Sequence, residues 1–312
     1  MRYRILGFVV ETDVALDLDQ VLEPVTPDIT FQQLTAELRD SVVCFPFHTL
    51  KQNDGTYWQS WSKSDHGYRL QFHDQAIFWL ATDGRRIRCF LYPETPINTL
   101  THLLLDQVLP YAISLRGQTV LHAGAVLIHE KAAVFLGTTG SGKSTLTASF
   151  CAAGFPLLAD DSLLVQPDHD KVWVIGSYPS VRLWSDSVDA VAPAQPLKRV
   201  SHYNDKQRLI PNAEGIIFHP DPVHIAGFYL LDNTGPPMDT VEFELVSPGT
   251  VFVALMRHTF RLDITDRVRA QQEFEALTQL AGRVPLYRLR YPREYDFLPQ
   301  VRQAIIEHLE HA

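Results

Sequence analysis

Cysteine is scarce in this chain of 312 residues. Its three cysteines, Cys44, Cys89 and Cys151, lie far apart and form no CxxC pair. A disulfide framework and a cysteine-ligated zinc site both need paired or closely spaced thiols, so the sequence indicates neither. We expect buried, reduced thiols in a cytosolic protein.

The chain also lacks an excess of positive charge and any long apolar run. Its net charge of -9 at pH 7 argues against nucleic acid as the main partner. The apolar run Ile5–Val10 ends at Glu11 and is too short for a signal peptide or a membrane span. We therefore expect a cytoplasmic protein with no membrane and no nucleic-acid partner, and we leave open a homo-oligomer.

The content of apolar residues, 46%, is enough for one large domain or two modest ones. Residues 1–98 are predicted to form a small β-rich domain with one helix at Thr30–Leu38. Asp83-Gly84 between two apolar runs indicates a hairpin. The predicted strands of this part are Tyr3–Glu11, Ser41–Phe45, Tyr68–Phe72, Ala76–Ala81 and Ile87–Leu91.

Residues 99–312 show the alternation of strands and helices that is typical of an α/β domain. Pro110 is expected to end or kink the first helix, and residues 190–212 to form a mobile basic loop. The predicted helices are Thr99–Ser114, Lys143 or Ser144 to about Gly154, Thr265–Ala281 and Phe297–His311. The predicted strands are Val120–Ile128, Lys131–Leu136, Phe155–Leu158, Leu163–Gln166, Val172–Ile175 and Ala226–Leu231.

One motif carries clear chemistry. The segment Gly137-Thr138-Thr139-Gly140-Ser141-Gly142-Lys143-Ser144-Thr145 matches GxxxxGK[ST] between a predicted strand and a predicted helix. Glycines let backbone N–H groups converge on an anion, and the helix N-terminus adds a positive dipole. Lys143 can reach the β- and γ-phosphates and Ser144 can ligate Mg²⁺. The motif predicts a site for ATP or a close relative.

Two adjacent carboxylates, Asp160 and Asp161, follow the apolar run Leu157-Leu158-Ala159. A strand that ends in aspartate is a usual source of a second Mg²⁺ contact beside bound nucleotide. The other carboxylate can accept the proton of an attacking hydroxyl. The alternative is that one of them caps a turn.

The run from Leu121-His122 through the glycine loop and Gly154-Phe155 to Ala159-Asp160-Asp161 resembles the catalytic core of the HPr kinase/phosphorylase family. It is most similar to HPr-kinase-like proteins, some of which are peptide kinases in lasso-peptide biosynthesis. The close resemblance covers about 45 residues, with weaker similarity through Tyr178–Trp184 and the Lys206–Arg208 loop.

The resemblance implies a P-loop kinase core related in fold to ATP-dependent phosphoenolpyruvate carboxykinase, and Mg²⁺-ATP phosphorylation of a serine hydroxyl. It implies that Asp160 is the catalytic base and Asp161 a magnesium ligand with Ser144, and the reverse assignment is left open. His122 matches a histidine near the transferring phosphate. The alternative for His122 is a ring satisfied by a backbone partner.

Three basic residues downstream are candidates for phosphate contacts. Arg182 can clamp the γ-phosphate, because guanidinium binds phosphoryl oxygens bidentately. Lys206 and Arg208 can do so from a loop that closes on ATP. The alternative for each is a solvated basic loop.

The chain departs from the family at two places. Thr145 stands where bifunctional members carry an acidic residue, and Ser180-Val181-Arg182-Leu183 replaces a Glu-Ile-Arg-Gly type signature. The resemblance therefore does not extend to the phosphorylase reaction or to HPr as the acceptor. We expect an ATP-dependent kinase acting on a serine of a peptide or small protein, such as a ribosomal peptide precursor. The alternatives are a regulatory nucleotide-binding protein with slow ATP hydrolysis and a small-molecule kinase.

Trp58, Trp61 and Trp79 are expected to lie in the core of the β-rich part. The alternative is an aromatic edge that binds a ligand peptide.

Overall fold

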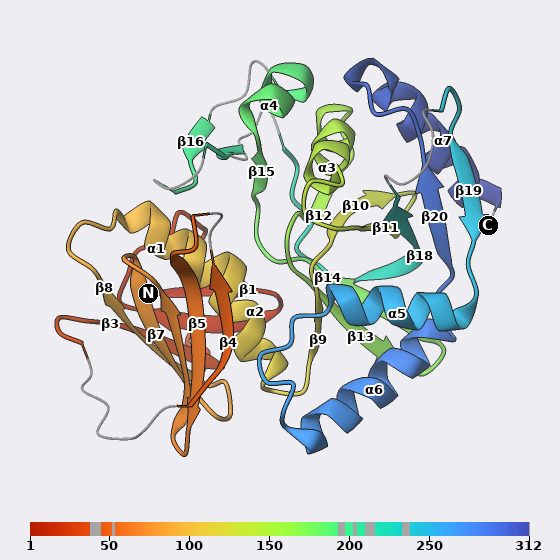
Figure 1. Ribbon diagram of the computed structural model, residues 1–312. Helices are drawn as coiled ribbons and strands as arrows, with labels where there is room; N and C mark the ends of the chain where they lie inside the picture. The colour runs from red at the N-terminus through yellow and green to blue at the C-terminus, as the bar shows by residue number, and fades with distance from the viewer. Residues whose placement is uncertain are drawn as a thin grey trace. The chain divides into compact units, whose positions relative to one another are not determined.

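The computed structural model shows a mixed α/β protein with several sheets (Figure 1). It describes residues 1–37, 45–51, 54–192, 197–201, 205–209, 216–232 and 238–311. The chain divides into two compact units. The first unit comprises Met1–Arg116 with Val200–Asn204, and the second comprises Gly117–Arg199 with Asp205–Ala312.

The first unit extends further along the chain than residue 98, where the sequence predicted the boundary. It includes a helical segment, because that segment packs closely on the strands of the same unit. The rings of Tyr111 and Trp61 meet edge to face at 4.9 Å between centroids. A Cβ atom at Gly84 would collide with the carbonyl oxygen of Ala112, so glycine allows the hairpin to approach the helix.

One twisted sheet makes up most of the first unit, with the strand order β1-β2-β3-β8-β7-β6-β5-β4. The pairs β2–β3 and β3–β8 are parallel and the other pairs are antiparallel. The strands are β1 (Arg2–Ile5), β2 (Phe8–Thr12), β3 (Ile29–Leu34), β4 (Phe45–Lys51), β5 (Tyr57–Ser64), β6 (Gly67–Phe72), β7 (Ala76–Ala81) and β8 (Arg86–Leu91).

The prediction of a helix at Thr30–Leu38 is wrong. Residues of this segment form β3, with Ile29 and Phe31 buried and Thr30 exposed between them. The alternation suits a strand, and parallel neighbours on both sides satisfy its backbone. Residue 38 lies outside the described residues, as do residues 41–44 of the predicted strand Ser41–Phe45.

The other strand predictions for this unit are largely confirmed. β6, β7 and β8 lie where expected, and Asp83-Gly84 joins β7 to β8. The run predicted as one strand at Tyr3–Glu11 is instead a hairpin, because Leu6 and Gly7 turn with φ of 52° and 77°. Of the tryptophans, Trp61 is buried, whereas Trp58 and Trp79 are half-buried.

The helix predicted at Thr99–Ser114 is present but irregular. It runs as α1 (Ile97–Leu103), a π-helical turn η1 (Leu104–Val108) and α2 (Leu109–Ser114). Pro110 lies in the first turn of α2 and has no N–H to donate to the preceding turn. The wider π-helical turn directly before it accommodates the proline, so the helical segment neither ends nor breaks there.

The second unit is built on another sheet with the strand order β12-β10-β11-β18-β14-β13-β9, which β20 and β19 extend from β18. The pairs β11–β18 and β18–β20 are parallel. The strands are β9 (Thr119–Leu121), β10 (Gly124–Ile128), β11 (Lys131–Leu136), β12 (Leu157–Ala159), β13 (Leu163–Asp168), β14 (Lys171–Ile175), β18 (Val223–Leu231), β19 (Glu242–Leu245) and β20 (Leu286–Arg290).

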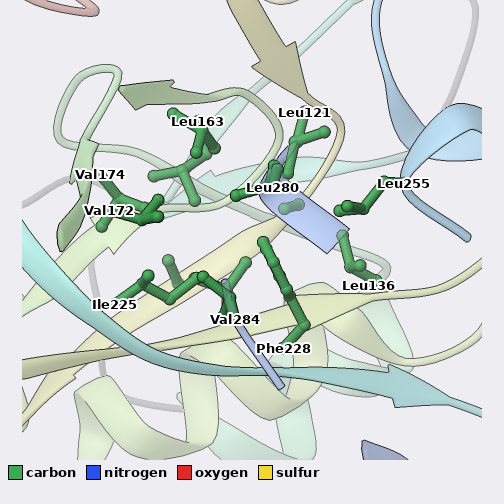
Figure 2. Packing of buried hydrophobic residues seen from close by; sticks show 14 of the residues in the cluster. Leu121, Leu136, Leu163, Val172, Val174, Ile225, Phe228, Leu255, Leu280 and Val284 are labelled. Atoms are coloured by element: carbon green, nitrogen blue, oxygen red, sulfur yellow. The ribbon is translucent and has the colours of Figure 1, made fainter. Parts of the chain in front are cut away.

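Helices cover both faces of this second sheet (Figure 1). On one face, a buried apolar cluster joins the sheet to α5 and α6, with Leu255 and Leu280 packed near Phe228 (Figure 2). On the other face, Phe135 of β11 stacks on Phe150 of α3 at 5.7 Å. The helices are α3 (Lys143–Ala152), α4 (Ser185–Val191), α5 (Pro248–His258), α6 (Arg267–Ala281), η2 (Tyr295–Phe297) and α7 (Leu298–His311).

Some boundaries in the second unit differ from prediction. The strand predicted at Val120–Ile128 is divided, because β9 pairs with β13 whereas β10 pairs with β11 and β12. His122 therefore lies in the break and not in a strand. The helices predicted near residues 143–154, 265–281 and 297–311 are confirmed as α3, α6 and α7.

The basic segment 190–212 is not a continuous loop in its described parts. It contributes β16 (Leu197–Arg199) and β17 (Gln207–Leu209), which form a small sheet with β15 (Val181–Leu183) in the order β15-β17-β16. Residues 193–196, 202–204 and 210–212 lie outside the described residues.

In the described part of the chain, no helix is both long enough and apolar enough to cross a membrane. Cys89 and Cys151 are free and buried, and Cys44 lies outside the described residues.

A glycine in the second unit allows two backbone segments to approach closely near the aspartate pair. Gly176 is buried after β14, and a Cβ atom there would collide with the carbonyl oxygen of Leu158. We expect Gly176→Ala to lower the free energy of unfolding by roughly 1–3 kcal/mol, because backbone has to move to admit the methyl group. Urea denaturation followed by circular dichroism measures the change.

Gly249→Ala is the matched control. Nothing lies within 4 Å of the Cβ position at Gly249, which is in the first turn of α5. Alanine there should be neutral or stabilise by up to about 1 kcal/mol. Equal stability of Gly176→Ala and the wild type would contradict the close contact.

Candidate functional site

The glycine loop connects β11 to α3, as its motif predicted. Gly140 and Gly142 have φ of 81° and 93°, which favours glycine at both positions. Within the loop, the N–H of Ser141 donates to the carbonyl of Thr138 at 3.0 Å. Thr138, Thr139 and Gly140 are exposed at its tip. The loop therefore presents open backbone directly before the N-terminus of α3, where an anion is favoured.

Lys143 begins α3 and bends back over the loop. Its Nζ donates to the carbonyl of Gly137 at 2.7 Å and to that of Thr138 at 3.2 Å. The residue is only 6% exposed. The pKa of Lys143 is lowered to about 8, chiefly by burial and to a smaller extent by the positive charge of Lys206. The negative charge of Asp160 acts in the opposite direction and raises this pKa. The ammonium group is thus held over the loop with poor solvation and only partial compensation.

Asp160 directly follows β12, at the strand end that the sequence predicted. Its Oδ2 accepts from the backbone N–H of Arg182 at 2.8 Å, and its Oδ1 is buried with no hydrogen-bond partner. Burial raises the pKa of Asp160, while hydrogen bonds from the Arg182 backbone and the Ser144 hydroxyl oppose the rise. One oxygen of a buried carboxylate therefore lacks a donor at the position where a cation would be stabilised.

Asp161 and Arg182 form an ion pair next to Asp160. Arg182 lies on β15 and is 6% exposed, so it is not part of a solvated basic loop, the alternative considered for it. One arginine thus contacts both aspartates, with its backbone on Asp160 and its guanidinium on Asp161. The arrangement fixes the direction of both carboxylates.

Two histidines lie beside these charges. The ring Nδ1 of His122 is 2.9 Å from the carbonyl oxygen of Asp161, and its backbone N–H donates to the carbonyl of His258 at 2.6 Å. The backbone partner considered as an alternative for His122 is therefore present. Burial, then the charges of Lys143 and Arg182, lower the pKa of His122 well below its ordinary value of 6.5. His122 is neutral at pH 7.

Lys206 and Arg208 both rest against aromatic rings. Lys206 Nζ is 5.2 Å from the ring centroid of Trp184, and the guanidinium carbon of Arg208 is 5.6 Å from that of Tyr178. The charge of Lys206 also lowers the pKa values of Lys143 and His122. Arg208 is directly opposite Arg182 in the β15–β17 pair.

Thr145 takes part in a different set of contacts. Its hydroxyl lies 3.1 Å from that of Ser187, which in turn lies 3.2 Å from the hydroxyl of Tyr295. The Tyr295 hydroxyl donates to Asp186 at 2.8 Å. These hydrogen bonds tie α3 to α4 and η2.

Sequence reasoning missed two residues of this site. Arg293 donates to the carbonyl of Ser141 at 2.6 Å and to that of Asp232 at 3.2 Å, with its guanidinium stacked on Tyr291. It therefore anchors the glycine loop from the segment after β20. His258 ends α5, where burial and the charge of Lys143 lower its pKa to about 4. Neither residue lies in a motif that could have shown its role.

Among the described residues, no group of three or more His, Cys, Asp and Glu side chains is arranged to hold a metal ion. Any ion at this site would need ligands from hydroxyl groups and from a bound anion as well as from a carboxylate.

No protein-family model matches the chain, and no curated protein matches it. Among solved structures, one similar chain is the Hpr(Ser) kinase/phosphatase from Coxiella burnetii, with 10% sequence identity and a TM-score of 0.32. The match covers 62% of this chain and 97% of that chain.

The buried charge of Lys143 should cost stability. The folded chain keeps this proton only below about pH 8, whereas the unfolded chain keeps it up to the ordinary pKa of 10.5. Stability therefore rises with pH between these values, as the folded state sheds the buried charge. We expect Lys143→Met to raise the free energy of unfolding at pH 7 by about 1–3 kcal/mol, and the gain to shrink between about pH 8 and 10.5.

Urea denaturation at several pH values measures this effect. The control is Lys131→Met at the exposed start of β11, which should change stability by less than about 0.5 kcal/mol. A Lys143→Met variant that is less stable than the wild type at pH 7 would show that the contacts to Gly137 and Thr138 outweigh the burial cost.

The anchoring of the glycine loop by Arg293 can be tested separately. We expect Arg293→Gln to speed amide hydrogen exchange in residues 137–142 by about tenfold, because charge-assisted hydrogen bonds worth about 1.5–3 kcal/mol are lost. Arg290→Gln is the control, since Arg290 pairs with half-exposed Glu242 on the surface. Unchanged exchange in the loop of Arg293→Gln would contradict the anchoring role.

Proposed function

We propose that this chain is an ATP-dependent kinase that phosphorylates a serine hydroxyl on a peptide or small protein. One observation carries the proposal: the loop lysine, the hydroxyl of Ser144, the aspartate pair and Arg182 all converge at the start of α3. Phosphoryl transfer needs a loop that binds phosphate, cationic groups that stabilise the charge on the phosphoryl group, and a base that accepts the hydroxyl proton. The resemblance seen in the sequence supports the same reaction class.

The site is suited to a triphosphate. Exposed loop backbone with positive φ at Gly140 and Gly142 leads into the first turn of α3, whose N–H groups favour an anion. Within the described part of the chain, the hydrogen bonds of Lys143 Nζ go to two carbonyl groups of its own loop. Phosphate oxygens can replace those carbonyls and would compensate the buried charge better.

The site is also suited to a magnesium ion. The buried, unpartnered Oδ1 of Asp160 and the nearby hydroxyl of Ser144 are oxygen donors of the kind that Mg²⁺ takes. Ser144 and one aspartate would hold the ion, with the remaining ligands from phosphate and water. Magnesium, when bound, neutralises charge on the β- and γ-phosphates.

In the proposed reaction, the serine oxygen forms a bond to the γ-phosphorus of ATP, and the bond from that phosphorus to the β–γ bridging oxygen breaks. ADP leaves, and the hydroxyl proton passes to an aspartate carboxylate. Lys143 and Arg182 stabilise the charge on the transferred group and on the leaving group. Burial raises the pKa of Asp160, and a carboxylate with a raised pKa is a stronger proton acceptor than an ordinary aspartate.

The two aspartates allow two assignments. The family resemblance makes Asp160 the base and Asp161 the magnesium ligand. Two observations support the exchanged roles: the Ser144 hydroxyl opposes the rise in the pKa of Asp160, and Asp161 is already paired with Arg182. The two assignments predict opposite behaviour of the two asparagine variants.

The test uses the full-length protein, Mg²⁺-ATP and a library of serine-containing peptides, with mass spectrometry to detect the gain of one phosphoryl group. We expect Lys143→Ala to abolish ATP binding and transfer. We expect both Asp160→Asn and Asp161→Asn to lower transfer at least about a hundredfold. The variant that still binds ATP more tightly with Mg²⁺ than without, by calorimetry, identifies the base, and the other identifies the metal ligand.

Asp168→Asn is the control, since Asp168 lies exposed at the end of β13 and should leave transfer unchanged. ATP hydrolysis without a phosphorylated peptide would favour the regulatory nucleotide-binding alternative. Full transfer by both asparagine variants would overturn the assignment of a base to this pair.

A further inference from the structure

A pocket of about 300 Å³ lies within the first unit, lined by residues of β5, β6, β7 and β8 and the turn between β5 and β6. The proposed kinase chemistry uses none of these residues. Three arginines, Arg69, Arg86 and Arg88, line the pocket together with Trp79 and His66. Its volume is at the lower end of the range for small-molecule sites.

The register of the strands places a tryptophan between two arginines. Arg69 of β6 is directly opposite Trp79 of β7, which is directly opposite Arg88 of β8. Residues opposite one another in a ladder share a face of the sheet, with Cβ atoms about 5 Å apart. The row therefore places Trp79 between two arginines on one face of the sheet.

The neighbouring row shows that this face is not the core. Tyr68, Leu80 and Ile87 are also mutually opposite and are all buried, whereas Arg69, Trp79 and Arg88 are half-buried. Successive side chains of a strand point to opposite faces. Trp79 thus lies on the outer face of the sheet and is not a core residue.

The pocket carries an excess of positive charge in an acidic chain. Arg69 pairs with Glu37 at 3.3 Å and donates to Gln71 at 2.8 Å. Within the residues that the structure describes, no acidic side chain forms an ion pair with Arg86 or Arg88. Among the described residues, the three arginines of the pocket have one ion pair with a carboxylate, that of Arg69 with Glu37, although the chain as a whole has a net charge of -9.

We propose that this pocket binds a small organic phosphate with a planar ring, of the size of a nucleoside monophosphate. The ring would stack on the indole of Trp79, because planar rings and bases stack favourably on aromatic side chains. The phosphate would lie on Arg88 and Arg86, since guanidinium groups bind phosphate oxygens bidentately. This site is distinct from the glycine loop and does not depend on the kinase proposal.

Calorimetry with three probes tests the site: AMP, adenosine and inorganic phosphate. To keep the glycine loop from contributing, the titrations are made in Lys143→Ala as well as in the wild type. We expect AMP to bind in both proteins, and at least about tenfold more tightly than adenosine or phosphate alone, because only AMP uses both the indole and the guanidinium groups.

Variants locate the binding. We expect Arg88→Gln and Trp79→Leu each to weaken AMP binding by at least about tenfold. Arg86→Gln should also weaken it, and provides a second variant should Trp79→Leu fail to fold. Arg85→Gln is the matched control, with the same change of charge in the same hairpin but outside the pocket lining, where Arg85 faces Asp83. It should change AMP affinity less than about twofold.

Three results would overturn the inference: no binding of AMP to the wild type, equal affinity in Arg88→Gln and the wild type, or binding that disappears in Lys143→Ala. The last result would place AMP at the glycine loop and would leave the kinase proposal intact.

Discussion

The contact of Arg182 with two adjacent aspartates determines the geometry of the candidate site. Its backbone N–H holds Asp160 at 2.8 Å and its guanidinium pairs with Asp161. Adjacent residues after a strand would otherwise point apart. Because Asp160 is buried, loss of this contact would leave its carboxylate with less compensation for burial. The positions of β12 and β15 are thus fixed through charge as well as through packing.

Buried charge has a cost that the rest of the site only partly offsets. Lys143 is held over loop carbonyls with its pKa lowered to about 8, and Asp160 is held with its pKa raised. Both shifts have burial as their largest cause, so both groups lie in an environment that disfavours their charged forms. Such paired, opposite shifts are common where a protein keeps groups ready for a charged ligand.

The sequence predicted the parts of the fold and site that depend on local chemistry. The glycine loop, the strand before it, the helix after it and the aspartates at the end of β12 depend on residues adjacent in the chain. The segment Thr30–Leu38 was misjudged because the parallel neighbours of β3 come from distant segments. Arg293 and His258 were missed for the same reason, since tertiary packing alone brings them to the loop. The division at residue 98 did not anticipate that the helical segment after it packs on Trp61 and Gly84.

The tryptophans of the first unit show how the two kinds of information combine. Composition alone allowed Trp58, Trp61 and Trp79 to be core residues or part of a binding edge. The ladder register separates them, because Trp61 contacts Tyr111 of the helical segment, whereas Trp79 lies in the row with Arg69 and Arg88 on the other face. In the proposed site, the half-buried indole of Trp79 would stack on the ring of a planar anion, and the arginines of the same sheet face would supply the counter-charge. The strand register therefore identifies Trp79 as the tryptophan to test for ligand binding.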